Sequence, residues 1–417
     1  MTNSKGKMHY GFVVAVGMFL LQFPACLILS AASIFYVPMT QEFNVSLSQC
    51  GLTVTILLLT QVVLMPSIAK ACNKIDMRIL LTVCLLIEAA CFAIRAMATG
   101  IMAFYITAAL LSIPFAIFLN MSIPIIVNNW FSINVGLMIG LCAASQGIGG
   151  MIFNSVGGLV IQNYGWRPCL WMYAAVCIVL IPISLFVIRT RPSDKGLEPY
   201  GYDSEEIKDK TVGVDIKESG ISLKKALKMP GFWFILIAVP VSCLICQINY
   251  YINAYIQSLG LQVAVAGAIT AILQLGVLVF KFALGAVSDK NMKAGAMFYC
   301  LCAVGTFVLL LVGGSNTIMI ILAVFLYGNI YAATNLYGPL AVKYQCGTKD
   351  FANIWSIIVM IVCILSGFGA TFWGIIIEKI GYRAAFSGCL GLTIVLMALY
   401  LLAFTQTKKM RLEWTED

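Results

Sequence analysis

Three ionisable side chains lie inside long apolar stretches of the sequence: Glu88, Arg95 and Lys281. A charge in such a segment is costly to bury, so each is a functional candidate by default. The compact ammonium of Lys281 offers three donors and suits a small anion such as a carboxylate. The alternative is structural, with the flexible stem of Lys281 reaching toward polar headgroups at the end of its segment.

Glu88 and Arg95 are seven residues apart, which on a helix places them on one face but about two turns from each other. That separation is too large for a direct contact between the two side chains. One interpretation is structural pairing of each residue with neighbouring segments. The other makes Glu88 a proton carrier, because burial lets a carboxyl group load and release protons.

Tyrosine and amide side chains are enriched in two further apolar stretches, at 231–257 and 317–341. Buried hydroxyls and amides need hydrogen-bond partners or water. They either bond between helices and form interfacial tyrosine belts, or they line a wet cavity and position a ligand. The candidates for ligand contact are Asn249, Tyr250, Tyr251, Tyr327 and Tyr331, with Trp355 as a cavity wall.

The sequence indicates neither a metal site nor a catalytic nucleophile. There are 15 cysteines and a single histidine, His9. Cys243-x-x-Cys246 has no second ligand pair, so we expect no zinc site and interpret the thiols as apolar packing. No G-x-x-x-x-G-K-[ST] loop occurs, so ATP is not the expected energy source. We therefore expect no cofactor and no enzymatic activity.

The composition excludes a soluble protein. Of 417 residues, 61% are hydrophobic and only 10% are charged, whereas a soluble domain is about 25% charged. This excludes a soluble enzyme, a nucleic-acid binder and a fibrous protein. The chain has room for a dozen membrane helices of about 20 residues each.

Twelve apolar segments of spanning length are separated by short polar, glycine or proline breaks. One long polar segment, 189–228, divides them six and six. The sequence thus predicts an all-α membrane protein with an N-terminal bundle at 1–188, a cytoplasmic linker at 189–228 and a C-terminal bundle at 229–417. The predicted spans are 10–38, 47–69, 79–99, 102–127, 135–161, 168–188, 231–257, 263–286, 294–313, 317–341, 352–377 and 384–404.

The lysine and arginine residues predict the orientation. With the N-terminus in the cytoplasm, 21 of the 26 fall in inside segments and three in outside loops. Basic residues favour the cytoplasmic side. We therefore expect a multi-pass protein of the cytoplasmic membrane with both termini inside. The net charge of +9 then records topology and does not imply a nucleic-acid partner.

Short sequence motifs recur in the two halves of the chain, and the members of each pair are separated by the same number of residues. Pro24 is matched by Pro240, and Gly165-Trp166-Arg167 is matched at the same offset by Gly381-Tyr382-Arg383. The segment that follows the second span, 69–74, is matched in the same way by 285–290 after the eighth. An even number of spans per half keeps both halves in the same orientation. Parallel repeats of this kind suit alternating access around a central site.

The motif Gly285-x-x-x-Asp289-Lys290 with Lys293 resembles the signature loop of the major facilitator superfamily. In the first half its counterpart is altered, with Asn73 in place of the aspartate, followed by Lys74. The resemblance implies the major facilitator fold of two six-helix halves. It also implies that the aspartate caps a neighbouring helix and latches the outward-facing state, so the change to Asn73 puts the first-half latch in question.

A second resemblance is to the oxalate:formate antiporter and monocarboxylate transporter branch. It rests on Asn129-Trp130-Phe131, Gly136-x-x-x-Gly140, Gln146-Gly147-x-Gly149-Gly150 and Gly165-Trp166-Arg167. This branch often has a substrate-binding arginine in the eighth span, near the position of Lys281. Oxalate transporters of the branch have a second cation in the eleventh span, but here 353–362 contains neither lysine nor arginine, which argues against oxalate.

The leading hypothesis is a monomeric secondary-active transporter of a small organic anion, with a monocarboxylate as the expected substrate, working by proton symport or anion exchange. Its partners are the anion, the lipid bilayer and, for symport, protons. The alternative is a proton-driven exporter of amphipathic or drug-like compounds. Such exporters generally carry acidic residues in span one or four, and none occurs here. The expected site residues are Lys281, Tyr250, Tyr251, Tyr327, Tyr331, Asn249 and Trp355, with gating residues Gly285, Asp289, Lys290, Asn73 and Lys74 and the candidate proton carrier Glu88.

Overall fold

The computed structural model describes residues 9–29, 32–133, 135–201, 220–314, 316–347 and 349–407. Twelve helical segments in this part of the chain are long and apolar enough to cross a membrane, which confirms the all-helical prediction. The spans are Tyr10–Phe43, Leu47–Cys72, Met77–Ala96, Met102–Trp130, Leu137–Tyr164, Trp166–Val187, Pro230–Ser258, Val263–Ser288, Met292–Val312, Thr317–Thr334, Asn353–Ile380 and Tyr382–Thr405.

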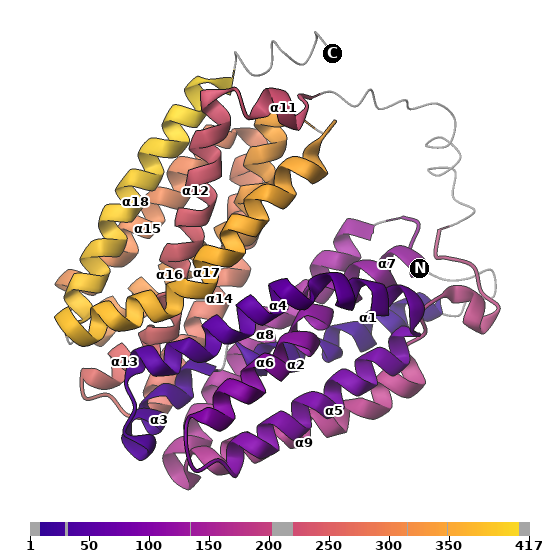
Figure 1. Ribbon diagram of the computed structural model, residues 1–417, viewed down its shortest axis with the longest axis horizontal. Helices are drawn as coiled ribbons and strands as arrows, with labels where there is room; N and C mark the ends of the chain where they lie inside the picture. The colour runs from indigo at the N-terminus through magenta and orange to yellow at the C-terminus, as the bar shows by residue number, and fades with distance from the viewer. Residues whose placement is uncertain are drawn as a thin grey trace. The chain divides into compact units, whose positions relative to one another are not determined.

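Most spans are single helices, but the first, fourth, sixth and seventh are built from several helical pieces (Figure 1). The elements are α1 (Tyr10–Leu21), α2 (Phe23–Ile28), η1 (Ala32–Phe35), α3 (Tyr36–Phe43), α4 (Leu47–Lys74), α5 (Met77–Ala96), α6 (Met102–Ala116), η2 (Ile117–Ser122), α7 (Ile123–Trp130), α8 (Val135–Tyr164), α9 (Trp166–Pro182), η3 (Ile183–Val187), η4 (Pro192–Lys195), α11 (Leu223–Ala226), α12 (Pro230–Cys246), α13 (Asn249–Ser258), α14 (Val263–Lys290), α15 (Met292–Val312), α16 (Thr317–Cys346), α17 (Phe351–Ile380) and α18 (Tyr382–Thr405).

The break between α1 and α2 lies beside a proline. Pro24 is in the first turn of α2, where its missing N–H and fixed φ are tolerated at a helix start. Gln22 stands at the junction, and its side-chain amide donates to Ser122 Oγ at 3.3 Å. The side-chain amide of Gln22, at the break in the first span, therefore finds its hydrogen-bond acceptor on the fourth span.

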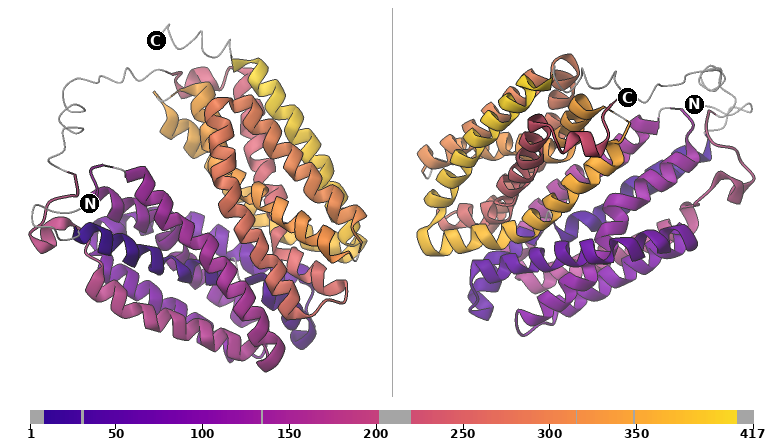
Figure 2. Two further views of the ribbon diagram at one scale, coloured as in Figure 1. Left: turned by 180° about the vertical axis from the view of Figure 1, so that it is seen from behind. Right: turned by 45° about the horizontal axis from the view of Figure 1, so that its top comes forward.

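The chain forms two compact units. The first comprises Met1–Phe43 with Ile56–Asp215, and the second comprises Asn44–Thr55 with Ile216–Asp417. In the first unit α5 packs against α9 and α6, and α8 packs against α1 and α2. In the second unit α14 and α15 pack against α16, and α12 and α15 pack against α18 (Figure 2). The predicted domain limits at 188 and 229 remain a prediction.

Helix boundaries repeat at the spacing found in the sequence. Helices α4 and α14 begin and end at equivalent positions of the repeat, and so do α8 and α17. Gly165 and Gly381, each directly before the next helix, have φ of 89° and 99°, a conformation that favours glycine. The sequence repeat is thus a repeat of helices and of the turns that join them.

Two glycines set the crossing of α14 and α16. A Cβ added at Gly276 would collide with the carbonyl oxygen of Phe325, and one added at Gly328 would collide with the backbone of Gly276. Small residues let helix backbones approach closely in a membrane. We call this contact the glycine crossing; it fixes the register of the two helices that carry Lys281 and Tyr331.

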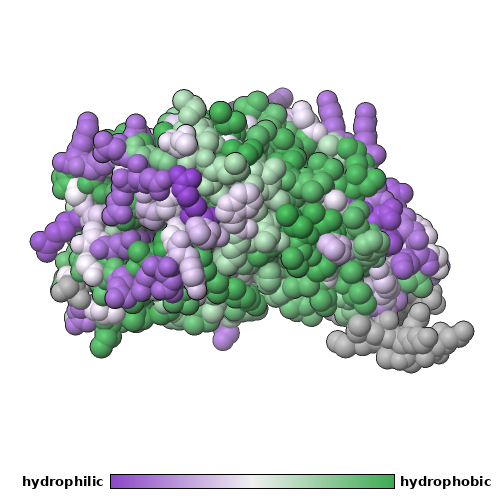
Figure 3. Space-filling view, turned by 90° about the horizontal axis from the view of Figure 1, so that it is seen from below, coloured by the Kyte–Doolittle hydropathy of each residue, from purple (hydrophilic) through white to green (hydrophobic). Residues whose placement is uncertain are grey.

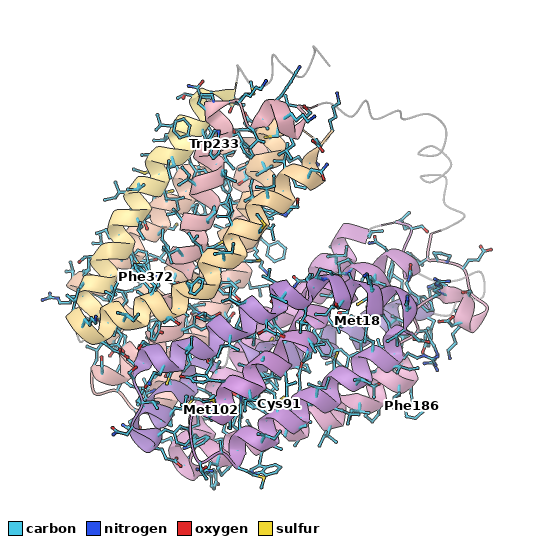
Figure 4. All side chains as sticks on the ribbon, viewed as in Figure 1. Met18, Cys91, Met102, Phe186, Trp233 and Phe372 are labelled. Carbon is cyan, nitrogen blue, oxygen red and sulfur yellow. The ribbon has the colours of Figure 1, made fainter. Side chains whose placement is uncertain are left out.

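The outer surface of the spans is apolar. Phe186, Trp233, Phe282 and Phe372 are all exposed, and three of them are labelled in Figure 4. On the face drawn in Figure 3, hydrophobic residues form a broad green area, and hydrophilic ones gather toward its margins. Such a surface is stable against lipid, whereas a water-soluble monomer rarely exposes so much apolar area.

Candidate functional site

Lys281 lies on the stripe of α14 that faces its own bundle. Val277 and Leu284, one turn away on either side, are buried, whereas Val279 and Phe282 on the opposite stripe are 43% and 73% exposed. Lys281 itself is half-buried. In the part of the chain that the structure describes, its ammonium makes no hydrogen bond and no ion pair. A half-buried cation without a protein partner can bind an anion.

Tyr331 lies on α16 at the level of Lys281. The glycine crossing is five residues before Lys281 and three before Tyr331, and a Cβ on Gly285 would be 3.8 Å from Leu336. These two contacts show that α14 and α16 run parallel to each other. Tyr331 is half-buried. The register therefore places the phenol of Tyr331 and the ammonium of Lys281 on neighbouring helices at similar depth.

Tyr251 and Tyr327 bond to main-chain carbonyls. Span seven is interrupted between α12 and α13, which leaves carbonyl groups at the end of α12 without helical partners. Tyr327 is fully buried and its hydroxyl donates to Cys246 O at 2.7 Å, while the Tyr251 hydroxyl donates to Ala370 O at 2.6 Å. These two hydrogen bonds attach the interrupted seventh span to the neighbouring helices α16 and α17.

Trp373 joins this arrangement and was not among the residues expected from the sequence. Its indole N–H donates to Leu244 O at 2.8 Å, and its ring is fully buried. Tyr327 and Trp373 thus satisfy carbonyls in the last turn of α12 from two different helices. The polar run that begins at Gln247 is the sequence signal for the break, but it does not identify the donors.

The other expected ligand contacts also lie in the second unit. Tyr250 is 5% exposed, and Asn249 and Trp355 are half-buried. The Trp355 ring stacks on Phe351 at an interplanar angle of 8°. It also lies 3.2 Å from the position that a Cβ on Gly338 would take. Trp355 is therefore packed between its own helix and α16.

The signature-loop residues are partly described. Lys290 and Lys74 are exposed at the ends of α14 and α4, and Gly285 has room for a Cβ in ordinary contact. The side chains of Asp289 and Asn73 lie outside the described residues. The role of these five residues in gating stays a prediction.

Helix capping follows these two loops directly. Asn291 accepts hydrogen bonds from two amides at the start of α15. In the first half, Asp76 caps α5 through the Arg78 amide and also binds the Arg78 guanidinium and the Thr190 hydroxyl. The Arg78 side chain, followed by these other donors, lowers the pKa of Asp76 to about 2. Asp76 therefore carries its charge throughout the physiological range.

Glu88 and Arg95 do not pair with each other. Glu88 is fully buried; one carboxyl oxygen contacts the Cys177 thiol at 3.6 Å, and the other has no hydrogen-bond partner. Arg95 donates to the Thr107 hydroxyl at 2.8 Å and lies over the ring of Phe104. Arg95 thus has structural partners on α6, whereas Glu88 has no cation in the described chain beside it.

No group of three or more histidine, cysteine or acidic side chains that could hold a metal ion was found among the described residues. The described cysteines carry free thiols and are mostly buried. Burial makes a thiol behave as a small apolar group.

Residues 18–345 match the family described as Major Facilitator Superfamily. The chain belongs to the major facilitator superfamily. It is a transporter and not an enzyme, as the sequence predicted. No curated protein matches the chain.

Solved transporter structures share the fold of this superfamily member. A bacterial homolog of the human lysosomal transporter Spinster, in an inward-facing and unoccupied conformation, aligns with a TM-score of 0.73 at 14% identity over 97% of this chain and 99% of that chain. The nucleoside transporter NupG aligns at 0.72 and 15% identity, over 95% and 99%. A D-xylose-proton symporter aligns at 0.69 and 14%, over 96% and 98%. At such identities the likeness extends to the fold alone.

Proposed function

We propose that this superfamily member transports a small organic anion, a monocarboxylate, by alternating access across the cytoplasmic membrane. The observation that carries the proposal is the half-buried Lys281 on the bundle-facing stripe of α14, with no anionic partner in the described chain. A bound carboxylate would supply the missing charge. The expected assignment to the oxalate:formate and monocarboxylate branch is part of this proposal.

The polar side chains of the second unit support a carboxylate with one charge. Tyr331 lies at its level and supplies a hydroxyl, and Asn249 and Tyr250 lie beyond the interruption of span seven. Span eleven offers Trp355 but no second cation at 353–362. One ammonium with hydroxyl donors matches a monoanion better than a dianion, because a second carboxylate would be desolvated without a partner.

Two hydroxyls that the sequence predicts as ligand contacts serve a different part of the proposal. Tyr251 and Tyr327 hold the interrupted span seven by bonding to Ala370 and Cys246. We therefore assign them a positioning role for the adjacent Asn249 and Tyr250. Replacing either by phenylalanine removes a bond to a buried carbonyl and is expected to lower stability as well as transport.

We further propose that Glu88 carries a coupled proton. The carboxyl group is fully buried without a cation in the described chain beside it, and an unpaired charge is costly in such surroundings, so the protonated form is favoured. Release of the proton then requires a conformation that admits water to the first unit. Proton symport with the anion follows from this assignment, whereas plain exchange would not need Glu88.

The test is uptake of labelled monocarboxylates into proteoliposomes containing the purified transporter. We expect saturable uptake that Lys281→Gln reduces by about 10- to 100-fold, since a charge-assisted bond contributes roughly 1.5–3 kcal/mol. Lys379→Gln is the matched control, because Lys379 is exposed in the last turn of α17, and it should retain uptake. Lys281→Arg, which keeps the charge, should retain more than Lys281→Gln.

The same vesicles distinguish the competing substrates. The structurally similar proteins include a nucleoside transporter and a D-xylose-proton symporter, so a nucleoside and xylose belong in the panel. Uptake of either at rates that exceed those of every monocarboxylate would contradict the proposal. So would monocarboxylate uptake by Lys281→Gln at the wild-type rate in a folded protein.

A further inference from the structure

The stripe of α14 that carries Lys281 holds a second polar group. Thr270, Gln274, Val277 and Lys281 follow one another at intervals of four, three and four residues, so they share one face of the helix. The first three are 6%, 4% and 3% exposed. Leu275, next to Gln274 in the chain but on the outer face, is 39% exposed. Gln274 is therefore turned toward the inside of its bundle.

Thr270 and Gln274 differ in how their polar atoms are satisfied. The Thr270 hydroxyl bonds to two carbonyl oxygens of its own helix, those of Ala266 and Gly267, at 3.0 and 2.9 Å. The Gln274 amide makes no hydrogen bond in the part of the chain that the structure describes. Burial of an amide without a partner costs free energy. The partner of Gln274 is therefore water or a bound molecule.

The Gln274 amide lies beside space that a water molecule can reach. Among the described residues, the fully enclosed polar atoms without a hydrogen bond include both amide atoms of Asn329 and the amide nitrogen of Asn253, but neither amide atom of Gln274. Since Gln274 has no hydrogen bond either, its amide is not fully enclosed. Polar atoms at such a position can bind water or a polar group of a solute.

The depth of Gln274 suits a substrate site. The eighth span runs from Val263 to Ser288, and Gln274 is close to its midpoint. Transporters built from repeats bind their substrates near the midplane of the bilayer. Lys281 is two turns further along the same stripe, which corresponds to about 10 Å of helix rise. Both side chains lean toward the N-terminal end of the helix, so their heads stay separated by roughly that distance.

The first half of the chain has no equivalent pair. Leu58 and Met65 of α4 occupy the positions that correspond to Gln274 and Lys281 in the repeat. Both are apolar, so this helix can be built without polar side chains at these positions. Buried amides in membrane helices commonly bond to another helix, but Gln274 bonds to no described neighbour. A packing role therefore does not account for the amide.

We propose that Gln274 binds an uncharged polar group of the substrate while Lys281 binds its carboxylate. The substrate class is then a monocarboxylate that carries a hydroxyl or keto oxygen. The amide suits either group, because it offers both a donor and an acceptor. With about 10 Å between the two heads and about 2.8 Å for each hydrogen bond, roughly 4–5 Å is left for the substrate between its polar ends. A chain of three or four carbon atoms spans that distance.

This assignment rests on the proposed anion transport and narrows its substrate. Lys281 attracts every monocarboxylate, because each carries the same charge. A site that bonds a hydroxyl disfavours the analogue without it, since the buried polar group then loses its partner. Gln274 therefore determines the preference among monocarboxylates, whereas Lys281 determines the affinity for all of them.

The test is uptake into the proteoliposomes of butyrate and of its derivatives with one hydroxyl, placed on the second, third or fourth carbon. Uptake by protein-free vesicles is subtracted to remove passive permeation. We expect the best hydroxy acid to be taken up about 2- to 10-fold more efficiently than butyrate, as one neutral hydrogen bond allows. In Gln274→Leu this ratio should fall to about one, because the hydroxy acid loses its advantage.

The matched control is Thr270→Val, which removes a hydroxyl from the same stripe. That hydroxyl bonds only within its own helix, so the variant should keep the wild-type ratio. Gln274→Met is a second apolar variant with an unbranched side chain. Neither Gln274 variant should lower the melting temperature, because no hydrogen bond within the protein is lost. Lys281→Gln, in contrast, should reduce the uptake of all the acids together.

Three results would overturn the assignment of Gln274 and leave anion transport in place. The first is equal wild-type uptake of butyrate and every hydroxy acid, which would mean that Gln274 binds only water. The second is a preference that persists in folded Gln274→Leu and Gln274→Met, and the third is a preference that Thr270→Val also loses. Uptake of a nucleoside or xylose but of none of the acids would contradict the proposed function itself, and the assignment with it.

Discussion

The first and second halves of the chain share a scaffold but differ in where the charges lie. Helices α4 and α14 have the same length and the same place in the repeat. Yet the first half has Met65 at the position equivalent to Lys281, and the second half has Val304 at the position equivalent to Glu88. Glu88 therefore has no counterpart in the second half, and Lys281 has none in the first. The repeat provides the framework, and the residues that we propose for transport differ between its two copies.

The helix termini show the same divergence. Arg167 forms a salt bridge with Glu42 at 2.6 Å and donates to the carbonyls of Ala96 and Ala98. Its counterpart Arg383 is exposed, and the residue equivalent to Glu42 is Ser258. The same Gly-aromatic-Arg motif therefore ties three segments together in the first half but has no carboxylate at this position in the second.

The largest expected effect concerns the glycine crossing. Gly276→Leu places a side chain against the Phe325 carbonyl, which cannot move without separating α14 from α16. We expect a destabilisation above about 4 kcal/mol and loss of folded protein. The equivalent Thr60→Leu in the first half should be tolerated, since Thr60 already carries a branched side chain at a half-buried position. Size-exclusion profiles and thermal melts measure both, and equal losses would show that the two halves are packed alike.

An intermediate effect is expected at Glu88. Glu88→Gln keeps the volume but cannot release a proton, so accumulation driven by a pH gradient should disappear while exchange of labelled for unlabelled anion persists. Glu198→Gln is the control, because its side chain is exposed. Gradient-driven uptake and counterflow in the same vesicles measure the two activities. Full gradient-driven uptake by Glu88→Gln would remove Glu88 from the coupling mechanism.

The smallest effect is expected at Arg167 and at Arg383, its counterpart in the repeat. Arg167→Met removes an exposed salt bridge and two bonds to carbonyls, for a loss of about 1 kcal/mol and a melting temperature lower by roughly 2–4 °C. Arg383→Met should leave the melting temperature unchanged, because Arg383 is exposed without a carboxylate at the equivalent of Glu42. A shift of equal size in both variants would contradict the proposed asymmetry.

Several features were predictable before the structure. The twelve spans, the all-helical fold and the superfamily follow from long apolar runs and from motifs such as Gly285-x-x-x-Asp289-Lys290. The internal repeat predicted which helices correspond. The separation of Glu88 and Arg95 also followed from spacing alone, and the structure gives each a different environment.

The sequence by itself determined the spans, because in lipid every backbone N–H and C=O must be satisfied within its own segment and only a helix does so. Tertiary structure decided which polar side chains serve the fold. Tyr327 and Trp373 find their acceptors on α12, far from them in the chain, and His9 finds Glu198 across a still longer stretch of sequence. Those partners exist only after an interrupted helix or a linker is packed against another segment, and no local pattern encodes that contact.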